Sequence, residues 1–117
     1  NFAIASLAIN HDNELISGSY REIKIWNMAS GQVISTLTEH SDWVRALVIN
    51  KNNELVSGSD DKTIKIWNTK TGQVRQTLTG HIGHVYSLII NRDNDLISGS
   101  RDKTIKIWKK RAISNYI

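Results

Sequence analysis

Short stretches of alternating apolar and polar residues recur along this chain of 117 residues. In Ile23-Lys24-Ile25-Trp26 the two isoleucines would face one side of an extended strand, and Lys24 and Trp26 the other. The pattern returns at 64–67 and 105–108, and turns rich in Asn, Asp, Gly and Ser separate it from other short apolar stretches. Nowhere does a helical period appear. The pattern predicts an all-β chain.

Four short antiparallel strands, joined by tight turns, are expected in each of three successive units. They are predicted over 2–9, 14–17, 23–26 and 33–37, then over 43–49, 54–57, 63–67 and 74–78, and in the last unit over 84–90, 95–98 and 104–108. No glycine turn follows Trp108. A fourth strand over 113–117, on a shortened turn, is an alternative for the end of that unit.

The three units are copies of one pattern. The sequence Ser-Gly-Ser-Asp-Asp-Lys-Thr-Ile-Lys-Ile-Trp at 57–67 returns with one change at 98–108 and, one residue shorter, at 17–26. The tryptophans that end it are 41 residues apart (67 − 26 and 108 − 67). A period near 40 indicates one supersecondary unit used repeatedly. We expect one repeat domain over 1–117, with units of approximately 1–38, 39–79 and 80–117.

Composition narrows the class of protein. Hydrophobic residues make up 39% and charged residues 22%, as in ordinary folded domains, and there is no cysteine. The lack of cysteine excludes a disulfide scaffold, a thiolate zinc site and a cysteine nucleophile, and it fits a reducing compartment. No apolar run is long enough for a membrane span, and the first residues lack the features of a signal peptide. We expect an intracellular protein, cytoplasmic or nuclear, with no membrane partner.

The net charge of +4 is concentrated near the end of the sequence. Lys109, Lys110 and Arg111 supply three of the four charges, which leaves the repeats near neutral (4 − 3 = +1). A nucleic-acid surface would spread its basic residues over a face. The short basic run favours a solvated segment, and the pattern does not favour nucleic acid as a partner.

Each unit resembles a WD repeat, the blade of the WD40 β-propeller family. The resemblance covers essentially the whole chain. It rests on a Gly-His pair before the first strand (Gly80-His81, weakened to Glu39-His40), on Ser-Gly-Ser ending the second strand, on a turn aspartate, and on the tryptophan that ends the third strand. The family has Asp after this tryptophan, where this chain has Asn27, Asn68 or Lys109. The resemblance implies a partial β-propeller of three four-stranded antiparallel blades that acts as a protein-interaction scaffold.

The resemblance also implies a buried hydrogen-bond network of His, Ser, Asp and Trp within each blade. Carried over by position, its members are His40, Ser57, Asp61 and Trp67 in the second unit, His81, Ser98, Asp102 and Trp108 in the third, and only Ser17 and Trp26 in the first. Such a network satisfies buried polar groups and specifies one packing. The first unit has no matching histidine and has lost a residue where the aspartate should stand. We expect it to be the least stable blade.

Catalytic, metal and cofactor sites are not expected. A Ser-His-Asp constellation that recurs with a tryptophan in two units indicates structural repetition, whereas a nucleophile needs one exposed site with an oxyanion hole. An enzyme using Ser98, His81 and Asp102 is the weaker alternative. His81 and His84 could pair on a metal, but no third ligand lies nearby in the sequence. No phosphate-binding glycine motif occurs, and no cofactor is predicted.

A binding surface is expected where propellers carry the loops before the first strand and between the second and third strands. Partners would be proteins or peptides, because loops on a rigid scaffold usually carry recognition. The residues at these points, which differ between otherwise similar units, are Ala3, Tyr20, Ser41, Trp43, Asp60, Ile82, His84 and Arg101. Trp43, Tyr20 and Arg101 are of the types that dominate binding hot spots. Packing of Trp43 between blades is an equal alternative.

Three blades do not close a ring, since propellers typically have four to eight. The apolar faces of the end blades would then be exposed, through residues such as Ile64, Ile66 and their equivalents. The chain is therefore expected to be part of a larger propeller or to complete one by self-association. The alternative function is a nucleic-acid-associated propeller that uses Lys109, Lys110, Arg111 and Arg101.

Overall fold

The computed structural model describes residues 2–111 and 115–117, and within these ranges the chain is all-β. Eleven strands follow one another: β1 (Ser6–Ile9), β2 (Leu15–Gly18), β3 (Ile23–Trp26), β4 (Val33–Leu37), β5 (Val44–Ile49), β6 (Leu55–Ser59), β7 (Ile64–Asn68), β8 (Gln73–Leu78), β9 (Val85–Ile90), β10 (Leu96–Ser100) and β11 (Ile105–Trp108). The predicted all-β class is confirmed.

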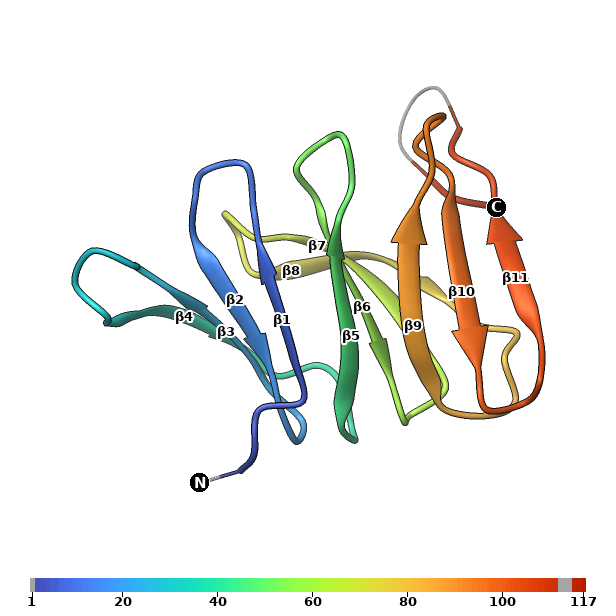
Figure 1. Ribbon diagram of the computed structural model, residues 1–117, viewed down its shortest axis with the longest axis horizontal. Helices are drawn as coiled ribbons and strands as arrows, with labels where there is room; N and C mark the ends of the chain where they lie inside the picture. Colours follow the sequence, from blue (N-terminus) through green and yellow to red (C-terminus); the bar gives the residue numbers. More distant parts are fainter. Residues whose placement is uncertain (1, 112–114) are drawn as a thin grey trace.

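The strands form three antiparallel sheets in the sequence orders β1-β2-β3-β4, β5-β6-β7-β8 and β9-β10-β11. We call these sheets blades 1, 2 and 3. Each is a meander, and the three stand side by side with β1, β5 and β9 along one side of the molecule (Figure 1). Contacts between neighbouring blades therefore run face to face. This arrangement is that of consecutive propeller blades.

The observed strands depart from the predicted ones mainly at their ends. The first strand begins at Ser6, and residues 2–5 are no strand, although the Ala5 N–H still bonds the Gly18 carbonyl at 2.8 Å. The second strands of blades 2 and 3 run on to Ser59 and Ser100, because they stay paired with β5 and β9 across a bulge. Turn chemistry sets these ends, and alternation alone does not mark them.

Blade 3 contains three strands in the part of the chain that the structure describes. Residues 112–114 lie outside the described residues. Of the alternative fourth strand over 113–117, the structure therefore describes only residues 115–117. There Lys109 and Ile117 exchange two backbone hydrogen bonds of 2.8 and 3.0 Å, and the Arg111 N–H bonds the Asn115 carbonyl at 2.7 Å. Residues 115–117 thus pair with residues 109–111, which follow β11, and not with β11 itself.

Tyr116, which the sequence patterns do not single out, is buried between blades 2 and 3 with 1% of its surface exposed. Asn50 donates to its hydroxyl at 3.1 Å. The Gln76 side chain donates to its carbonyl at 2.6 Å and accepts its N–H at 2.9 Å. Burial raises the pKa of the Tyr116 phenol. These contacts hold the end of the described chain against β8.

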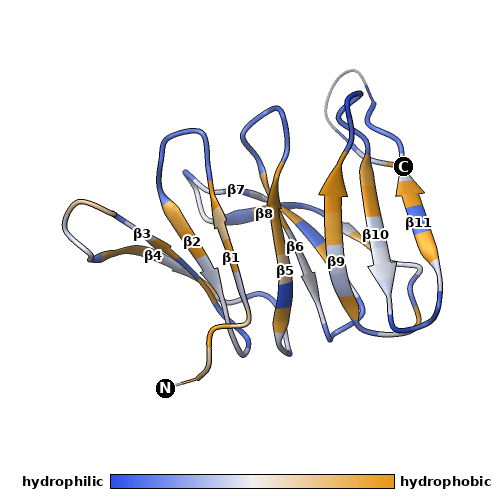
Figure 2. Cartoon of the chain, in the orientation of Figure 1, coloured by the Kyte–Doolittle hydropathy of each residue, from blue (hydrophilic) through white to orange (hydrophobic). Residues whose placement is uncertain are grey.

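The core consists of two apolar layers, one at each blade–blade junction, and the apolar residues follow the strands in Figure 2. The layer between blades 1 and 2 contains Ile16, Ile23, Ile25, Leu37, Val44, Leu55 and Trp67. The layer between blades 2 and 3 contains Ala46, Val56, Ile64, Ile66, Leu78, Val85, Leu88, Leu96 and Tyr116. In β7, for example, Ile64 and Ile66 belong to the second layer and Trp67 to the first, as the period of two requires.

The expectation that Ile64 and Ile66 lie on an exposed end face is wrong. Both are 1% exposed, because blade 3 covers them. Their equivalents in blade 3, Ile105 and Ile107, are 74% and 61% exposed. The exposed apolar faces are thus the far side of blade 3 and, at the other end, the side of blade 1 that carries Leu7.

Candidate functional site

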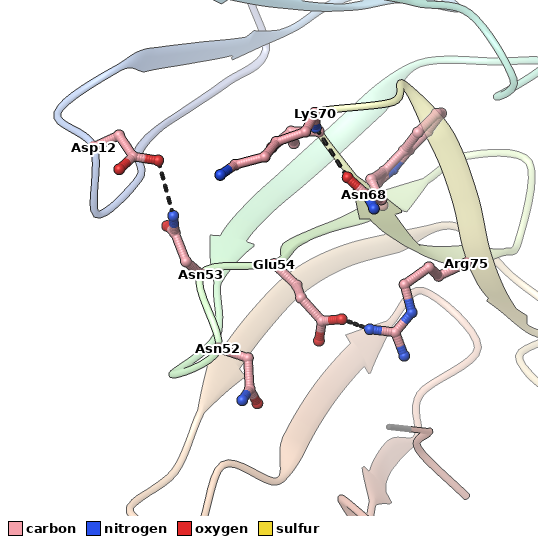
Figure 3. A pocket seen from close by; sticks show the side chains of 9 residues that line it. Asp12, Asn52, Asn53, Glu54, Asn68, Lys70 and Arg75 are labelled. Atoms are coloured by element: carbon pink, nitrogen blue, oxygen red, sulfur yellow. Dashed lines mark hydrogen bonds and ion pairs between the residues drawn. The ribbon is translucent and has the colours of Figure 1, made fainter. Parts of the chain in front are cut away.

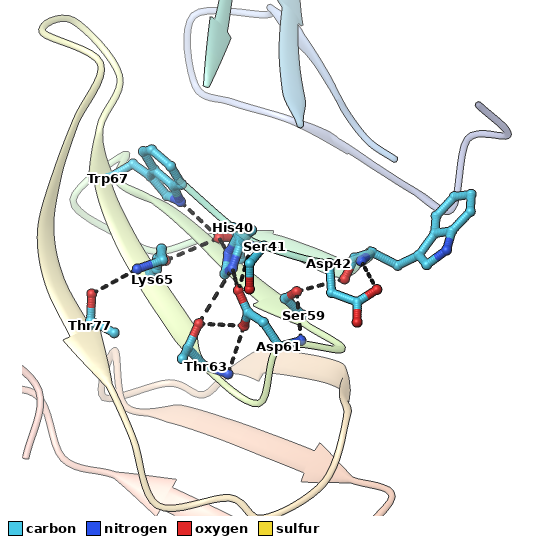
Figure 4. Close-up of polar contacts among 11 residues, drawn as sticks. His40, Ser41, Asp42, Ser59, Asp61, Thr63, Lys65, Trp67 and Thr77 are labelled. Carbon is cyan, nitrogen blue, oxygen red and sulfur yellow. Dashed lines mark hydrogen bonds and ion pairs between the residues drawn. The ribbon is translucent and has the colours of Figure 1, made fainter. Parts of the chain in front are cut away.

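The four network residues of blade 2 lie within hydrogen-bonding distance of one another. His40 Nε2 lies 2.6 Å from Ser57 Oγ, and His40 Nδ1 lies 2.8 Å from Asp61 Oδ2. The indole N–H of Trp67 donates to the same Ser57 oxygen at 2.8 Å. Figure 4 shows the imidazole between the tryptophan and the aspartate. The network thereby joins the loop before β5 to strands β6 and β7.

Donor and acceptor chemistry gives this chain of bonds one direction. An indole N–H only donates and a carboxylate only accepts, so the proton on Nδ1 of His40 points to Asp61. Nε2 then accepts the hydroxyl proton of Ser57, whose oxygen receives the Trp67 N–H. Every buried polar side-chain atom in this series of hydrogen bonds has a partner. Its members are the groups whose burial without partners would be costly.

Asp61 closes the network at the surface side. Its carboxylate accepts the Thr63 hydroxyl at 2.6 Å, the Thr63 N–H at 3.0 Å and the Ser41 N–H at 3.1 Å. Burial acts to raise its pKa, but the hydrogen bonds from His40 and Thr63 outweigh it and hold the pKa well below the ordinary 3.8. Asp61 is therefore ionised at neutral pH and ties the β6–β7 turn to the loop before β5.

Blade 3 repeats this geometry. His81 lies 2.7 Å from Ser98 Oγ through Nε2 and 2.9 Å from Asp102 through Nδ1, and Trp108 donates to Ser98 at 3.0 Å. The hydroxyl of Thr104 lowers the pKa of Asp102 most; burial opposes this, and His81 adds to it. Trp108 is only half-buried, whereas Trp67 is fully buried. The same four residue types therefore occur in two different packing environments.

Blade 1 keeps one bond of the network, from the Trp26 indole to Ser17 at 2.9 Å. Its shorter β2–β3 turn is held in another way. The Arg21 N–H bonds the Asp42 carbonyl at 3.0 Å, and the Val44 N–H bonds the Ser19 carbonyl at 2.9 Å. In blade 1, backbone hydrogen bonds to the loop before β5 thus hold this turn. In blades 2 and 3 the hydrogen bond between His and Asp holds it.

Acid is expected to destabilise blade 2 through Asp61. A carboxyl whose pKa is lower in the folded state stabilises that state above its unfolded pKa and loses the contribution as pH falls through the folded pKa. The urea midpoint should therefore fall as pH drops below about 4, and Asp61→Asn should flatten this part of the profile. Glu39→Gln, at an exposed position in the loop before β5, is the control. Equal profiles for Asp61→Asn and the wild type would contradict the assignment.

The buried serines do not present a nucleophile to solvent. Ser57 and Ser98 are both 0% exposed, and each hydroxyl is occupied by an indole N–H and an imidazole. Among the described residues no group of three or more His, Asp, Glu or Cys could hold a metal ion. His81 uses both ring nitrogens in its network, and His84 Nδ1 lies 3.2 Å from Asp60.

Three aromatic side chains gather at one end of the blade 1–blade 2 junction. The ring centroids of Phe2, Tyr20 and Trp43 are 5.0 to 6.2 Å apart, and Tyr20 and Trp43 also form an isolated β-bridge. The Arg45 guanidinium lies over the Trp43 ring, 5.1 Å from its centroid. We call these four residues the aromatic face. Trp43 is half-buried, so it both packs between blades and keeps an exposed part.

Asp60, a predicted contact residue, is placed differently from the expectation. Its side chain is 4% exposed, and it accepts three hydrogen bonds of 3.0 to 3.2 Å from Arg45. His84 approaches the same carboxylate. The hydrogen bonds with Asp60 raise the pKa of Arg45, so Arg45 is a permanent cation. Asp60 therefore positions Arg45, and its own carboxylate is covered by Arg45 and His84.

The remaining predicted contact residues surround the aromatic face or lie beyond it. Ser41 and Arg101 are exposed, and Ile82 is 81% exposed. The Arg101 N–H bonds the His84 carbonyl at 2.9 Å, which brings the two loops of blade 3 together. Sequence reasoning missed Phe2 and Arg45. The signal for Arg45 was its position two residues after Trp43, on the same side of a strand.

The basic residues near the end of the sequence are partly engaged within the chain. Lys109 Nζ lies 3.4 Å from Asp95, and Lys110 Nζ lies 5.5 Å from the centre of the Tyr116 ring. Arg111 and Arg101 are exposed. No helix long and apolar enough to cross a membrane occurs among residues 2–111 and 115–117.

Comparison with known proteins gives consistent matches. The model of the WD40 family, described as WD domain, G-beta repeat, matches residues 31–68 and 72–109. The WD40 β-propeller domain of Doa1 superposes with a TM-score of 0.87 at 28% identity, over 94% of this chain and 38% of that structure. The predicted propeller architecture and the predicted family resemblance are thereby confirmed.

Curated relatives match over a shorter stretch. The Lissencephaly-1 homolog of Caenorhabditis briggsae is 47% identical over 53 residues, which is 44% of this chain and 14% of that protein. The ribosome biogenesis protein YTM1 of Vanderwaltozyma polyspora is 36% identical over 62 residues, covering 52% of this chain and 14% of that protein. The matched part is thus 14% of the length of each of these relatives.

Proposed function

This chain belongs to the WD40 repeat family, and from that premise we propose that it is a non-enzymatic protein-interaction scaffold whose partner contacts the aromatic face. WD40 domains generally act as protein-binding scaffolds. The absence of cysteine is consistent with our proposal that the protein is located in a reducing, intracellular compartment. The chain is further proposed to be part of a larger propeller or to assemble into one, because both end blades expose apolar sheet faces.

The observation that carries this proposal is the cluster of Phe2, Tyr20 and Trp43 with Arg45 laid over it. The few residues that carry most of the binding energy at protein interfaces are enriched in Trp, Tyr and Arg. Arg45 is held by the buried carboxylate of Asp60, so it loses little side-chain freedom on binding. The cluster is partly exposed and lies at one end of the blade 1–blade 2 junction, which favours recognition of a protein or peptide.

A peptide-selection experiment tests the site. A random peptide library displayed on phage would be panned against the chain, and each enriched peptide would be titrated against variants by fluorescence anisotropy. Tyr20→Ala or Arg45→Ala should weaken binding at least tenfold, since removal of a hot-spot side chain costs about 2 kcal/mol or more. Ser35→Ala, on β4 and away from the aromatic face, is the control and should leave the affinity unchanged.

Two other results would contradict the aromatic face as the binding site. Enriched peptides that bind Tyr20→Ala and Arg45→Ala as tightly as the wild type would move the site elsewhere. The same titrations would be run with single- and double-stranded DNA and RNA oligonucleotides. Tight binding that falls steeply with salt and is lost on neutralising Lys109, Arg111 and Arg101 would favour the nucleic-acid alternative over the scaffold.

A further inference from the structure

The turn between the first and second strands has the same five-residue pattern in all three blades, at 10–14, 50–54 and 91–95. In each copy the side-chain oxygen of the first asparagine accepts the N–H groups of the third and fifth residues at 2.9 to 3.0 Å. The fourth residue, Asn13, Asn53 or Asn94, has a left-handed φ of 61°, 60° or 65°. Asparagine tolerates this conformation well. The turn is therefore a preorganised element.

In blade 2 the fourth asparagine of this turn reaches across to blade 1. Asn53 Oδ1 accepts the His11 N–H at 2.7 Å, and Asn53 Nδ2 donates to Asp12 Oδ2 at 3.1 Å. Figure 3 shows this contact between the two turns. A single side chain thus bonds both the backbone and a side chain of the preceding blade. We call such a pair of bonds a rung.

A second rung joins blade 3 to blade 2 in the same way. Asn94 Oδ1 accepts the Lys51 N–H at 2.8 Å, and Asn94 Nδ2 donates to Asn52 Oδ1 at 2.7 Å. The two rungs use equivalent atoms, although the acceptor is a carboxylate in one and an amide in the other. The rungs therefore form a polar ladder that runs from turn to turn across the three blades, beside the apolar layers that lie between them.

The ladder ends in complementary groups. In blade 1, Asn13 is exposed, and its side chain makes no hydrogen bond within residues 2–111 and 115–117. In blade 3, the Arg92 N–H and the exposed Asp93 carboxylate correspond to the groups that Asn53 and Asn94 engage, and they too have no partner in the described ranges. One end thus presents the asparagine of a rung and the other presents its acceptor and donor.

The apolar end faces match in the same sense. At the blade 1–blade 2 junction, Leu55 and Trp67 pack against Ile23 and Ile25. In blade 1 the equivalents of the first pair, Leu15 and Trp26, line an open hollow of about 360 Å³ with Ile4, Leu7 and Met28. In blade 3 the equivalents of the second pair, Ile105 and Ile107, are exposed. The two end faces are therefore the two halves of a junction that the chain already contains.

We propose that a second copy of this chain docks head to tail on these faces, and that Asn13 of one copy forms a rung with the Arg92 N–H and Asp93 of the next. Two copies contribute six blades, within the four to eight of known propellers, whereas three copies would contribute nine. The ladder specifies register, because apolar faces alone slide more freely than paired hydrogen bonds permit. This inference rests on the proposed completion of the propeller and names its partner.

The test is sedimentation equilibrium of the 117-residue chain and two variants. The wild type should be a dimer. Asn13→Asp keeps a residue suited to positive φ but sets a second carboxylate against Asp93, so association should weaken at least tenfold. The double variant Asn13→Asp/Asp93→Asn restores one donor and one acceptor and should recover most of the affinity. Such rescue requires residue 13 of one copy to face residue 93 of another.

Asn52→Asp is the matched control. It adds the same charge in the same kind of turn, and its carboxylate still accepts from Asn94, as Asp12 accepts from Asn53. Its dimer affinity should equal that of the wild type. A dimer that is indifferent to Asn13→Asp would overturn the ladder but leave completion of the propeller by self-association standing. A chain that stays monomeric at 100 times the concentration used for peptide titrations would overturn both, without touching the peptide result.

Discussion

Trp67→Ala is expected to reduce the free energy of unfolding by about 3–5 kcal/mol, a large fraction of what a domain of this size has. Trp67 is fully buried in the layer between blades 1 and 2, and its indole N–H is bonded to Ser57. Its removal leaves a large cavity and an unoccupied acceptor. Urea unfolding followed by far-ultraviolet circular dichroism measures the change without relying on tryptophan fluorescence.

Trp26→Ala is the matched control for this prediction. Trp26 ends the same Ile-Lys-Ile-Trp strand and bonds the equivalent serine, Ser17, at 2.9 Å, but it is half-exposed on the end face of blade 1. At protein concentrations below those at which the proposed dimer forms, its loss should cost about 1–2 kcal/mol. Similar losses for the two variants would show that blade 1 is covered in solution or that burial of Trp67 contributes less than its position indicates.

Ser57→Ala is expected to cost about 1–3 kcal/mol, because it strands two buried groups, the Trp67 indole N–H and His40 Nε2. His40→Ala should cost a similar amount. The double variant should lose less than the sum, with a coupling of about 0.5–3 kcal/mol, since the residues belong to one hydrogen-bonded chain. Chemical denaturation of the four proteins of this double-mutant cycle gives the coupling.

The control cycle combines Ser57→Ala with Ser98→Ala. The two serines occupy equivalent positions in different blades and share no hydrogen-bond partner, so their losses should add within about 0.5 kcal/mol. Ser17→Ala should cost the least of the three serine variants, because Ser17 receives only the Trp26 indole N–H. An additive His40–Ser57 cycle would mean that the short contacts of blade 2 contribute no joint stability.

Much of the candidate site could be predicted because its signal is repetition. The tryptophan spacing and the recurring Ser-Gly-Ser placed Ser57, Asp61 and Trp67 in one unit, and the structure brings them together with His40. The surface residues were harder to assign. Asp60 has the sequence context of an exposed turn aspartate, yet Arg45 and His84 enclose it. Such enclosure depends on side chains from two blades, which no local pattern records.

Phe2 and Tyr116 show the same limit at the two ends of the chain. Phe2 lies in a segment with the alternation of a strand, but it turns toward Tyr20 and Trp43 and joins no sheet. Tyr116 follows no repeat position, and it becomes buried because Gln76 and Asn50 offer partners to its backbone and hydroxyl. Both placements are long-range events, decided by groups far away in the sequence.

Alternation, turn chemistry and a spacing of about 40 residues were enough to predict the strands and the repeat, and the resemblance to WD repeats assigned the members of the polar networks. Which copies are buried depended on the fold. Ile64 and Ile105 stand in nearly identical sequence, yet one is 1% and the other 74% exposed. The physical reason is that burial is a property of the neighbouring face: blade 3 covers Ile64, and no described residue of this chain covers Ile105.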